Sequence, residues 1–224
     1  MDLNKILAKN HTAEEVSTLW TIYHATRSGG TGHGYLSATI PLETYLSMTS
    51  LAAKHPSFIL PLSRPPHTLQ TPHPAHEFYF LQWDSHKSPP HPSQPPTLSF
   101  EAKPLFSTTP PNPACTTVLF TPLQEYKLRQ TFAQPYLVLT HYTDLATTHG
   151  IVLMRGELTP SPSSPRKYLL SQADAQLLAM GVQRFYLTAG DDSSTQRMQL
   201  LTKFHETPID FRWEDLLAYA DPTA

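Results

Sequence analysis

The stretch Phe78-Tyr79-Phe80-Leu81-Gln82-Trp83 decides the fold class, because it is apolar on both faces and therefore predicts a buried strand. Shorter apolar runs precede and follow it, at 58–60 and 117–120, and each predicts another strand. Pro61, directly after the first run, indicates an edge strand or the end of a strand. Since strands follow strands here without intervening helices, we predict an α+β fold with a single mixed, largely antiparallel sheet flanked by helices.

Helices are expected on both sides of this region, where apolar residues recur at helical spacing. Capping-box spacing predicts that Thr12 and Ser171 each begin a helix, and Thr121 before Pro122 predicts the start of a third. Gly181 is expected to end the helix that begins at Ser171. Further helices are expected from Pro41, over 194–205 and over 213–219, and a single helical turn is expected to end at Gly150. Further strands are expected at 98–100, 136–139, 151–154 and 185–187.

The distribution of proline indicates how the chain is organised. Most of the 23 prolines lie between 56 and 113, in segments of Pro, His, Ser and Thr with few apolar residues. Such composition favours extended, solvated backbone, so Pro/His-rich surface loops are expected at 63–76 and 85–96. We expect these loops to belong to a single domain over 11–220, preceded by a short helix or tail at 1–10 and followed by a tail at 221–224.

Charge and composition exclude several classes of protein. The 16 Lys and Arg against 18 Asp and Glu give a net charge of −2 without any basic run, so no contact with nucleic acid is expected. Cys115 is the only cysteine, which excludes an internal disulfide. No stretch reaches the roughly 20 apolar residues that cross a bilayer, so no membrane span is expected either. We expect the chain to be a monomer.

The sequence lacks the usual motifs of enzymes. The glycine-rich segment 29–34 has no Lys-Ser/Thr at its end and follows a helix, so it is neither a phosphate-binding loop nor a dinucleotide fingerprint. No Gly-x-Ser-x-Gly motif occurs. The acidic pairs at 14–15, 191–192 and 214–215 stand at expected helix starts, where negative charge is stabilising. We therefore assign no catalytic residue, no cofactor and no enzymatic activity.

Histidines are the one feature that could indicate a metal site. Five of them fall within 25 residues: His67, His73, His76, His86 and His91. A cluster of imidazoles could bind zinc, and the alternative function is a small metal-dependent hydrolase that uses these loops. However, these histidines alternate with prolines and have no second cysteine to join them, so we expect no metal site. Two histidines elsewhere, at 24 and 141, are expected to be structural.

Eight segments, taken in order, resemble a known family. They are WTIYH (20–24), FILPL (58–62), EFYFLQW (77–83), FTPLQEY (120–126), LTHYTDL (139–145), GIVLMRGE (150–157), QRFY (183–186) and FHETPIDF (204–211). Together they resemble the mitochondrial ATP synthase assembly chaperones that bind the beta subunit of the catalytic head. The resemblance runs from about residue 11 to residue 217.

The resemblance implies a molecular chaperone rather than an enzyme. Such a protein would bind the unassembled ATP synthase beta subunit, prevent its aggregation and release it to the alpha subunit during assembly of the head. The implied location is the mitochondrial matrix, although the first residues show neither a secretory signal nor an Arg/Ser-rich import sequence. Masking an interface until the partner arrives suppresses wrong association by mass action.

The expected contact residues come from two of the family-like segments. Interfaces favour aromatic, Met and Arg anchors with few other charges, and Met154, Arg155, Arg184 and Tyr186 match this preference. We expect these four residues to contact the partner. The alternative is that Met154 and Tyr186 belong to the core and that the two arginines form internal salt bridges.

Overall fold

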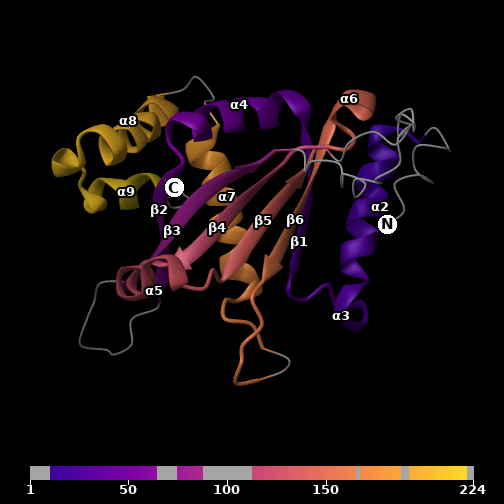
Figure 1. Cartoon of the computed structure of the whole chain (residues 1–224), viewed down its shortest axis with the longest axis horizontal. Helices are drawn as coiled ribbons and strands as arrows, with labels where there is room; N and C mark the ends of the chain where they lie inside the picture. The colour runs from indigo at the N-terminus through magenta and orange to yellow at the C-terminus, as the bar shows by residue number, and fades with distance from the viewer. Residues whose placement is uncertain (1–10, 65–74, 88–112, 165–166, 188–191, 221–224) are drawn as a thin grey trace, which may run out of the picture.

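One antiparallel sheet forms the centre of the molecule (Figure 1). The computed structural model describes residues 11–64, 75–87, 113–164, 167–187 and 192–220. The strands are β1 Tyr35–Pro41, β2 Ser57–Arg64, β3 Ala75–His86, β4 Cys115–Pro122, β5 Leu137–Tyr142 and β6 Ile151–Leu158. Their order is β1-β6-β5-β4-β3-β2, and all neighbours pair antiparallel, which confirms the predicted α+β class.

Helices pack on both faces of this sheet. They are α2 Ala13–Ala25, α3 Arg27–Gly30, α4 Leu42–Lys54, α5 Leu123–Arg129, α6 Ala146–His149, α7 Gln172–Tyr186, α8 Asp192–Glu206 and α9 Trp213–Ala220, with 3-10 turns at Gln130–Phe132 and Pro208–Asp210. In Figure 1, α7 runs behind the strands, whereas α2 and α5 lie toward the viewer at opposite sides of the sheet. Helices α8 and α9 pack together beside α7 and β2.

The main core lies between the sheet and helices α4, α7 and α8. Alternate residues of each strand point into it, for example Val118 and Phe120 of β4 and Leu137 and Leu139 of β5, each no more than 2% exposed. Burial of such side chains is the dominant favourable term in folding. The strand patterns at 58–60, 117–120 and 151–154 are therefore confirmed as parts of β2, β4 and β6, and that at 136–139 is confirmed as β5 except for Tyr136, which precedes the strand.

Helix α2 forms a smaller apolar cluster on the opposite face. Val16 and Trp20 pack against Ile151 and Leu153 of β6, and the indole Nε1 of Trp20 donates a hydrogen bond to the carbonyl oxygen of Met154 at 2.9 Å. The predicted capping box begins this helix: the Thr12 hydroxyl accepts from the Glu15 amide, and the Glu15 carboxylate accepts from the Thr12 amide. The capping box therefore determines where α2 begins, and the spacing of its apolar residues determines which side is buried.

The predicted stop at Gly181 and strand at 185–187 are wrong, because α7 continues through Gly181 to Tyr186. A Cβ atom at Gly181 would lie 2.8 Å from Cδ1 of Leu60. The glycine therefore allows the helix to approach the sheet closely and does not terminate it. The start of this helix is as predicted, since the Ser171 hydroxyl accepts from the Asp174 amide.

Two further local expectations differ from the structure. Thr121 does not cap α5, because β4 extends to Pro122 and the helix begins at Leu123 without a side-chain cap. Strand β1 is not predicted from the sequence, although its core-facing residues Leu36, Ala38 and Ile40 form a short apolar alternation. The expected strand at 98–100 lies outside the described residues.

The expected Pro/His-rich loops are described only at their ends. Strand β2 extends to Arg64 and β3 covers 75–86, so His76 and His86 are residues of β3. The other three histidines of the cluster lie outside the described residues. His86 lies ten positions after His76 along the strand, about 33 Å at the usual rise, and this distance excludes a common metal ion for the pair.

Candidate functional site at the open edge of the sheet

Among the residues that the structure describes, the outer edge of β1, the first strand of the sheet, pairs with no other strand. Hydrogen bonds from the Leu158 amide to the Gly34 carbonyl and from the Leu42 amide to the Gly150 carbonyl fix which residues of β1 bond to β6. Because an antiparallel ladder alternates, the main-chain groups of Leu36, Ala38 and Ile40 face β6, and those of Ser37 and Thr39 face outward. Within the described residues, no hydrogen bond to these outward main-chain groups is recorded.

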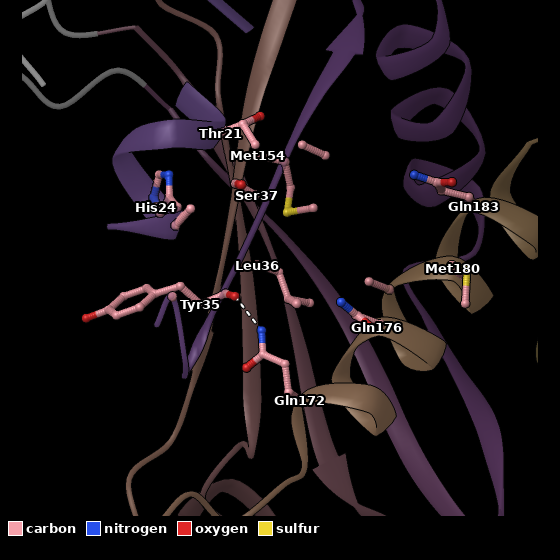
Figure 2. Close-up of a pocket in the computed structure, with 14 residues that line it drawn as sticks. Thr21, His24, Tyr35, Leu36, Ser37, Met154, Gln172, Gln176, Met180 and Gln183 are labelled. Atoms are coloured by element: carbon pink, nitrogen blue, oxygen red, sulfur yellow. Dashed lines mark hydrogen bonds between the residues drawn. The ribbon is translucent and has the colours of Figure 1, made fainter. Parts of the chain in front are cut away.

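Gln172 of α7 occupies the beginning of this edge. Its side-chain Nε2 donates to the Tyr35 carbonyl at 2.6 Å (Figure 2), and its Oε1 accepts from the Gly34 amide at 3.0 Å. These two hydrogen bonds give the Tyr35 carbonyl and the Gly34 amide a partner where the chain enters β1. The free portion of the edge therefore starts at Ser37.

A groove runs along the free portion of β1, between α2 and α7 (Figure 2). Its volume is about 460 Å³. Side chains of three elements line it: Thr21, His24 and Ala25 of α2, Tyr35 to Ala38 of β1, and Gln172, Gln176, Ala179, Met180 and Gln183 of α7, with Gly32 and Met154. None of these described lining residues is Lys, Arg, Asp or Glu, so the groove is uncharged apart from the titration of His24.

Two polar atoms beside the free edge lack a partner among the described residues. His24 is 2% exposed, its Nδ1 lies 3.0 Å from the Trp20 carbonyl, and its Nε2 has no hydrogen bond. Burial lowers the pKa of His24, which favours the neutral ring with Nδ1 as donor and Nε2 as acceptor. The hydroxyl of Thr39 is likewise buried without a partner. Unpaired buried polar groups are uncommon in native proteins and require an explanation.

The opposite edge of the sheet is closed by its sequence. The bond from the Trp83 amide to the Pro56 carbonyl fixes the ladder, so Pro61 occupies an outward-facing position of β2. Proline has no N–H to offer another strand, and helix α9 also packs against β2. The predicted edge position of this strand is thus confirmed, and the two edges of the sheet differ in their ability to accept a further strand.

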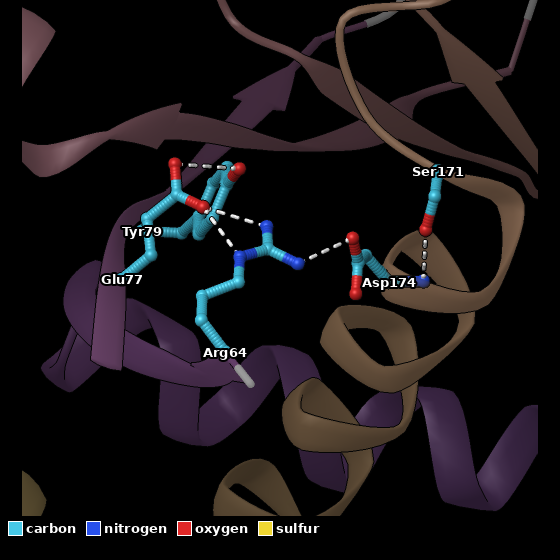
Figure 3. Close-up of polar contacts among 5 residues, drawn as sticks. All are labelled: Arg64, Glu77, Tyr79, Ser171 and Asp174. Atoms are coloured by element: carbon cyan, nitrogen blue, oxygen red, sulfur yellow. Dashed lines mark hydrogen bonds and ion pairs between the residues drawn. The ribbon is translucent and has the colours of Figure 1, made fainter. Parts of the chain in front are cut away.

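An ion-pair cluster fastens this closed edge to α7 (Figure 3). Nε and Nη2 of Arg64 donate to one carboxylate oxygen of Glu77 at 2.9 and 2.6 Å, and Nη1 donates to Asp174 at 2.7 Å. The hydroxyl of Tyr79 donates to the second Glu77 oxygen at 3.1 Å. Burial opposes the charge of Arg64, but its bonds to the two carboxylates outweigh burial and raise its pKa. The cluster joins β2, β3 and the first turn of α7.

The structure separates the four expected contact residues. Met154 is 6% exposed and lines the groove, whereas Arg155 lies on the opposite face of β6, 2.6 Å from Glu157. Tyr186 is fully buried and its hydroxyl donates to the His55 carbonyl at 2.8 Å. Arg184 is half-buried on α7. Met154 alone of the four therefore lines the groove.

The histidine at position 141 sits inside the main core. Its Nδ1 lies 3.2 Å from the Thr116 hydroxyl, and the ring of Trp83 stacks on it at 5.7 Å. Burial lowers the pKa of His141 to about 4, so the ring is neutral near pH 7. A neutral, enclosed imidazole of this kind fits the expected structural role.

Neither a cluster of metal-ligating side chains nor a membrane-spanning helix is found among the described residues. Within residues 11–64, 75–87, 113–164, 167–187 and 192–220, no group of three or more His, Cys, Asp or Glu side chains is arranged to hold a metal ion. None of the helices in these ranges combines the length and apolar character that crossing a bilayer requires.

A sheet edge left unpaired between two helices can accept an extended peptide as a further strand. The chain belongs to the ATP11 family, because the family model described as ATP11 protein matches residues 1–217. The relative named "Protein atp11, mitochondrial" from Schizosaccharomyces pombe is 30% identical over 205 residues, which cover 91% of this chain and 55% of that protein.

Two mammalian relatives carry a more explicit name. "ATP synthase mitochondrial F1 complex assembly factor 1" of Homo sapiens is 25% identical over 212 residues, 95% of this chain and 48% of the human protein. The Mus musculus protein of the same name is 24% identical over 215 residues, 96% of this chain and 49% of its own length. The chain thus spans about half the length of the curated relatives it matches.

Proposed function

We propose that this chain is a mitochondrial assembly chaperone that binds the unassembled beta subunit of ATP synthase, prevents its aggregation and supports assembly of the catalytic head. The observation that carries the proposal is membership of the ATP11 family over residues 1–217, together with relatives named as F1 complex assembly factors. The proposed location is the mitochondrial matrix, and the proposed role is binding without catalysis.

The distribution of exposed apolar side chains supports a binding role for the helices beside the groove. Five of the ten large apolar residues exposed in the described chain belong to α2 or α7: Leu19, Ile22, Tyr23, Leu177 and Met180. Met180 lines the groove, whereas the other four lie on parts of α2 and α7 outside its lining. We therefore place the proposed contact on α2, β1 and α7.

Three of the four residues expected as anchors remain part of this proposal, whereas Tyr186 is fully buried in the core. Met154 contributes to the wall of the groove, and Arg155 lies on the neighbouring strand, where it also approaches the ring of Tyr142. If Arg155 and Arg184 contact the partner, Arg155→Ala and Arg184→Ala will weaken protection of beta subunit while the melting temperature changes little. Full protection by both variants would remove the arginines from the contact.

Light scattering tests the proposed function directly. Isolated beta subunit, diluted from denaturant, should scatter light as it aggregates, and an equimolar amount of this chain should suppress that scattering. Serum albumin at the same concentration is the control for crowding and non-specific adsorption. Scattering that is the same with this chain as with albumin would contradict the proposal.

A further inference from the structure

We propose that the free edge of β1 accepts an extended, uncharged segment of the unassembled beta subunit as an additional strand of the sheet. This inference rests on the proposed function, since it names the way in which the same partner is held. It assigns the groove between α2 and α7 to the main chain of that partner, and it assigns the groove walls to the partner's side chains.

The direction of the main-chain groups carries the inference. Ser37 lines the groove, and its N–H and C=O point away from β6, as do those of Thr39 further along the same edge. Only an extended chain offers donors and acceptors at the matching two-residue spacing, and helices satisfy their own main-chain groups internally. Strand addition is an established means of peptide recognition for an edge of this kind.

The two helices set the chemistry of the segment. Side chains of a strand alternate between the faces of the sheet, so one set would face Ala179 and Met180 of α7 and the other would face Thr21 and Ala25 of α2. The first wall favours apolar side chains and the second favours small or hydroxyl-bearing ones. Because none of the lining residues carries a carboxylate, an ammonium or a guanidinium group, a charged side chain in the groove would lose its hydration without gaining a partner.

The contrast between the two sheet edges supports a use for this one. An unprotected edge invites unwanted pairing, and proteins usually blunt such edges with proline, charge or a covering helix. Strand β2 has Pro61 at an outward position in its middle, whereas the outward positions of β1 are Tyr35, Ser37 and Thr39, with a proline only at the end of the strand, at Pro41.

The variant Ser37→Pro removes the outward N–H while leaving the bonds between β1 and β6 in place. We expect it to weaken binding of beta subunit at least tenfold, because the donor is lost and the ring obstructs the incoming strand. Ser63→Pro is the matched control, since Ser63 also faces outward but lies on the closed edge of β2. Met180→Lys, which places a charge in the groove at a residue 42% exposed, should weaken binding without unfolding the chain.

Amide hydrogen exchange of the unaltered chain gives a test that needs no variant. In the free chain the Ser37 amide should exchange quickly and the Ala38 amide slowly, because only the latter bonds to β6. On binding beta subunit, exchange at Ser37 should slow at least tenfold while Ala38 changes little.

Three outcomes would overturn the inference. If beta subunit binds but Ser37 still exchanges quickly and Ser37→Pro binds normally, strand addition is wrong and the proposed function stands. If the unaltered chain fails to bind beta subunit, the proposed function and this inference fail together. If gel filtration of the chain alone shows a dimer that Ser37→Pro dissociates, the occupant of the edge is a second copy.

Discussion

At the scale of single residues, Gly156 sets the separation of β1 and β6. A Cβ atom there would lie 2.8 Å from Cβ of Leu36 and 3.0 Å from Cδ2 of Leu139. Because the Leu36 Cβ is fixed to its backbone, rotation of a side chain cannot relieve the first contact. We expect Gly156→Ala to lower the free energy of unfolding by roughly 1–3 kcal/mol, as overpacked cores do. Urea denaturation measures this, and an unchanged midpoint would contradict the close packing of these strands.

His141 should make stability depend on pH. An unfolded chain protonates this ring near pH 6.5, whereas the folded chain, in which burial lowers the pKa of His141, does so only near pH 4. The unfolded state therefore binds more protons between these values, and stability falls as the pH drops from about 6.5 to about 4. The loss from this residue should approach roughly 3 kcal/mol at pH 4.

The variant His141→Gln isolates this contribution to the pH dependence. Unfolding free energies measured at pH 7 and pH 4.5 should differ less for the variant than for the parent chain. Some dependence will remain, because burial also lowers the pKa of His24 and of His55. Equal pH dependence in the two proteins would show that His141 is protonated as readily in the folded state as in the unfolded state.

Single residues also show which parts of the fold the sequence could predict. Thr12 and Ser171 cap their helices through neighbours three residues away, and local spacing is enough to identify them. The prediction that Gly181 ends its helix is wrong because a glycine can either end a helix or allow a helix to pack close to a sheet. Its actual neighbour, Leu60, is 121 positions away in the sequence, and local pattern carries no information about that contact.

At the scale of elements, the Arg64 cluster should hold α7 against β2 and β3. Its side chains are partly exposed, 28% for Arg64, 39% for Glu77 and 18% for Asp174, so solvent screens the attraction. We expect Arg64→Ala to lower the unfolding free energy by about 1–2 kcal/mol, because the buried part of Asp174 loses its partner.

The variant Arg64→Lys distinguishes geometry from charge in this cluster. A lysine keeps the positive charge but lacks the planar group that reaches both carboxylates at once, so it should recover only part of the stability that Arg64→Ala loses. Guanidinium denaturation of the three proteins provides the comparison. Complete recovery by Lys would mean that the bonding geometry in Figure 3 contributes nothing beyond charge.

The strands beside the groove show why the groove could not be predicted from the sequence. Strand β1 has only three core-facing positions and follows a glycine-rich segment, so its pattern is weak. Its partner β6 lies more than a hundred residues later, and the pairing alone decides that Ser37 faces outward. Of the four residues expected to bind the partner, Met154 lines the groove. The signal that could have found the strand was the alternation of Leu36, Ala38 and Ile40.

At the scale of the whole molecule, the asymmetry of the sheet connects the fold with the proposed function. Both faces receive helices, one edge has Pro61 in the middle of its strand, and the other has a proline only at the end of β1 and, among the described residues, no strand paired to Ser37 or Thr39. A chaperone must bind tightly enough to prevent aggregation and still release its client to the true partner. A short edge that offers a few main-chain bonds would suit such reversible binding, since each bond contributes modestly in water.

Direct binding to purified subunits is the measurement that tests the central claim. Sedimentation velocity of this chain with isolated beta subunit should show a one-to-one complex at micromolar concentration, whereas the same experiment with isolated alpha subunit should show two separate species. Addition of alpha subunit to the first mixture should release this chain. Sedimentation of this chain and beta subunit as independent species would contradict the account.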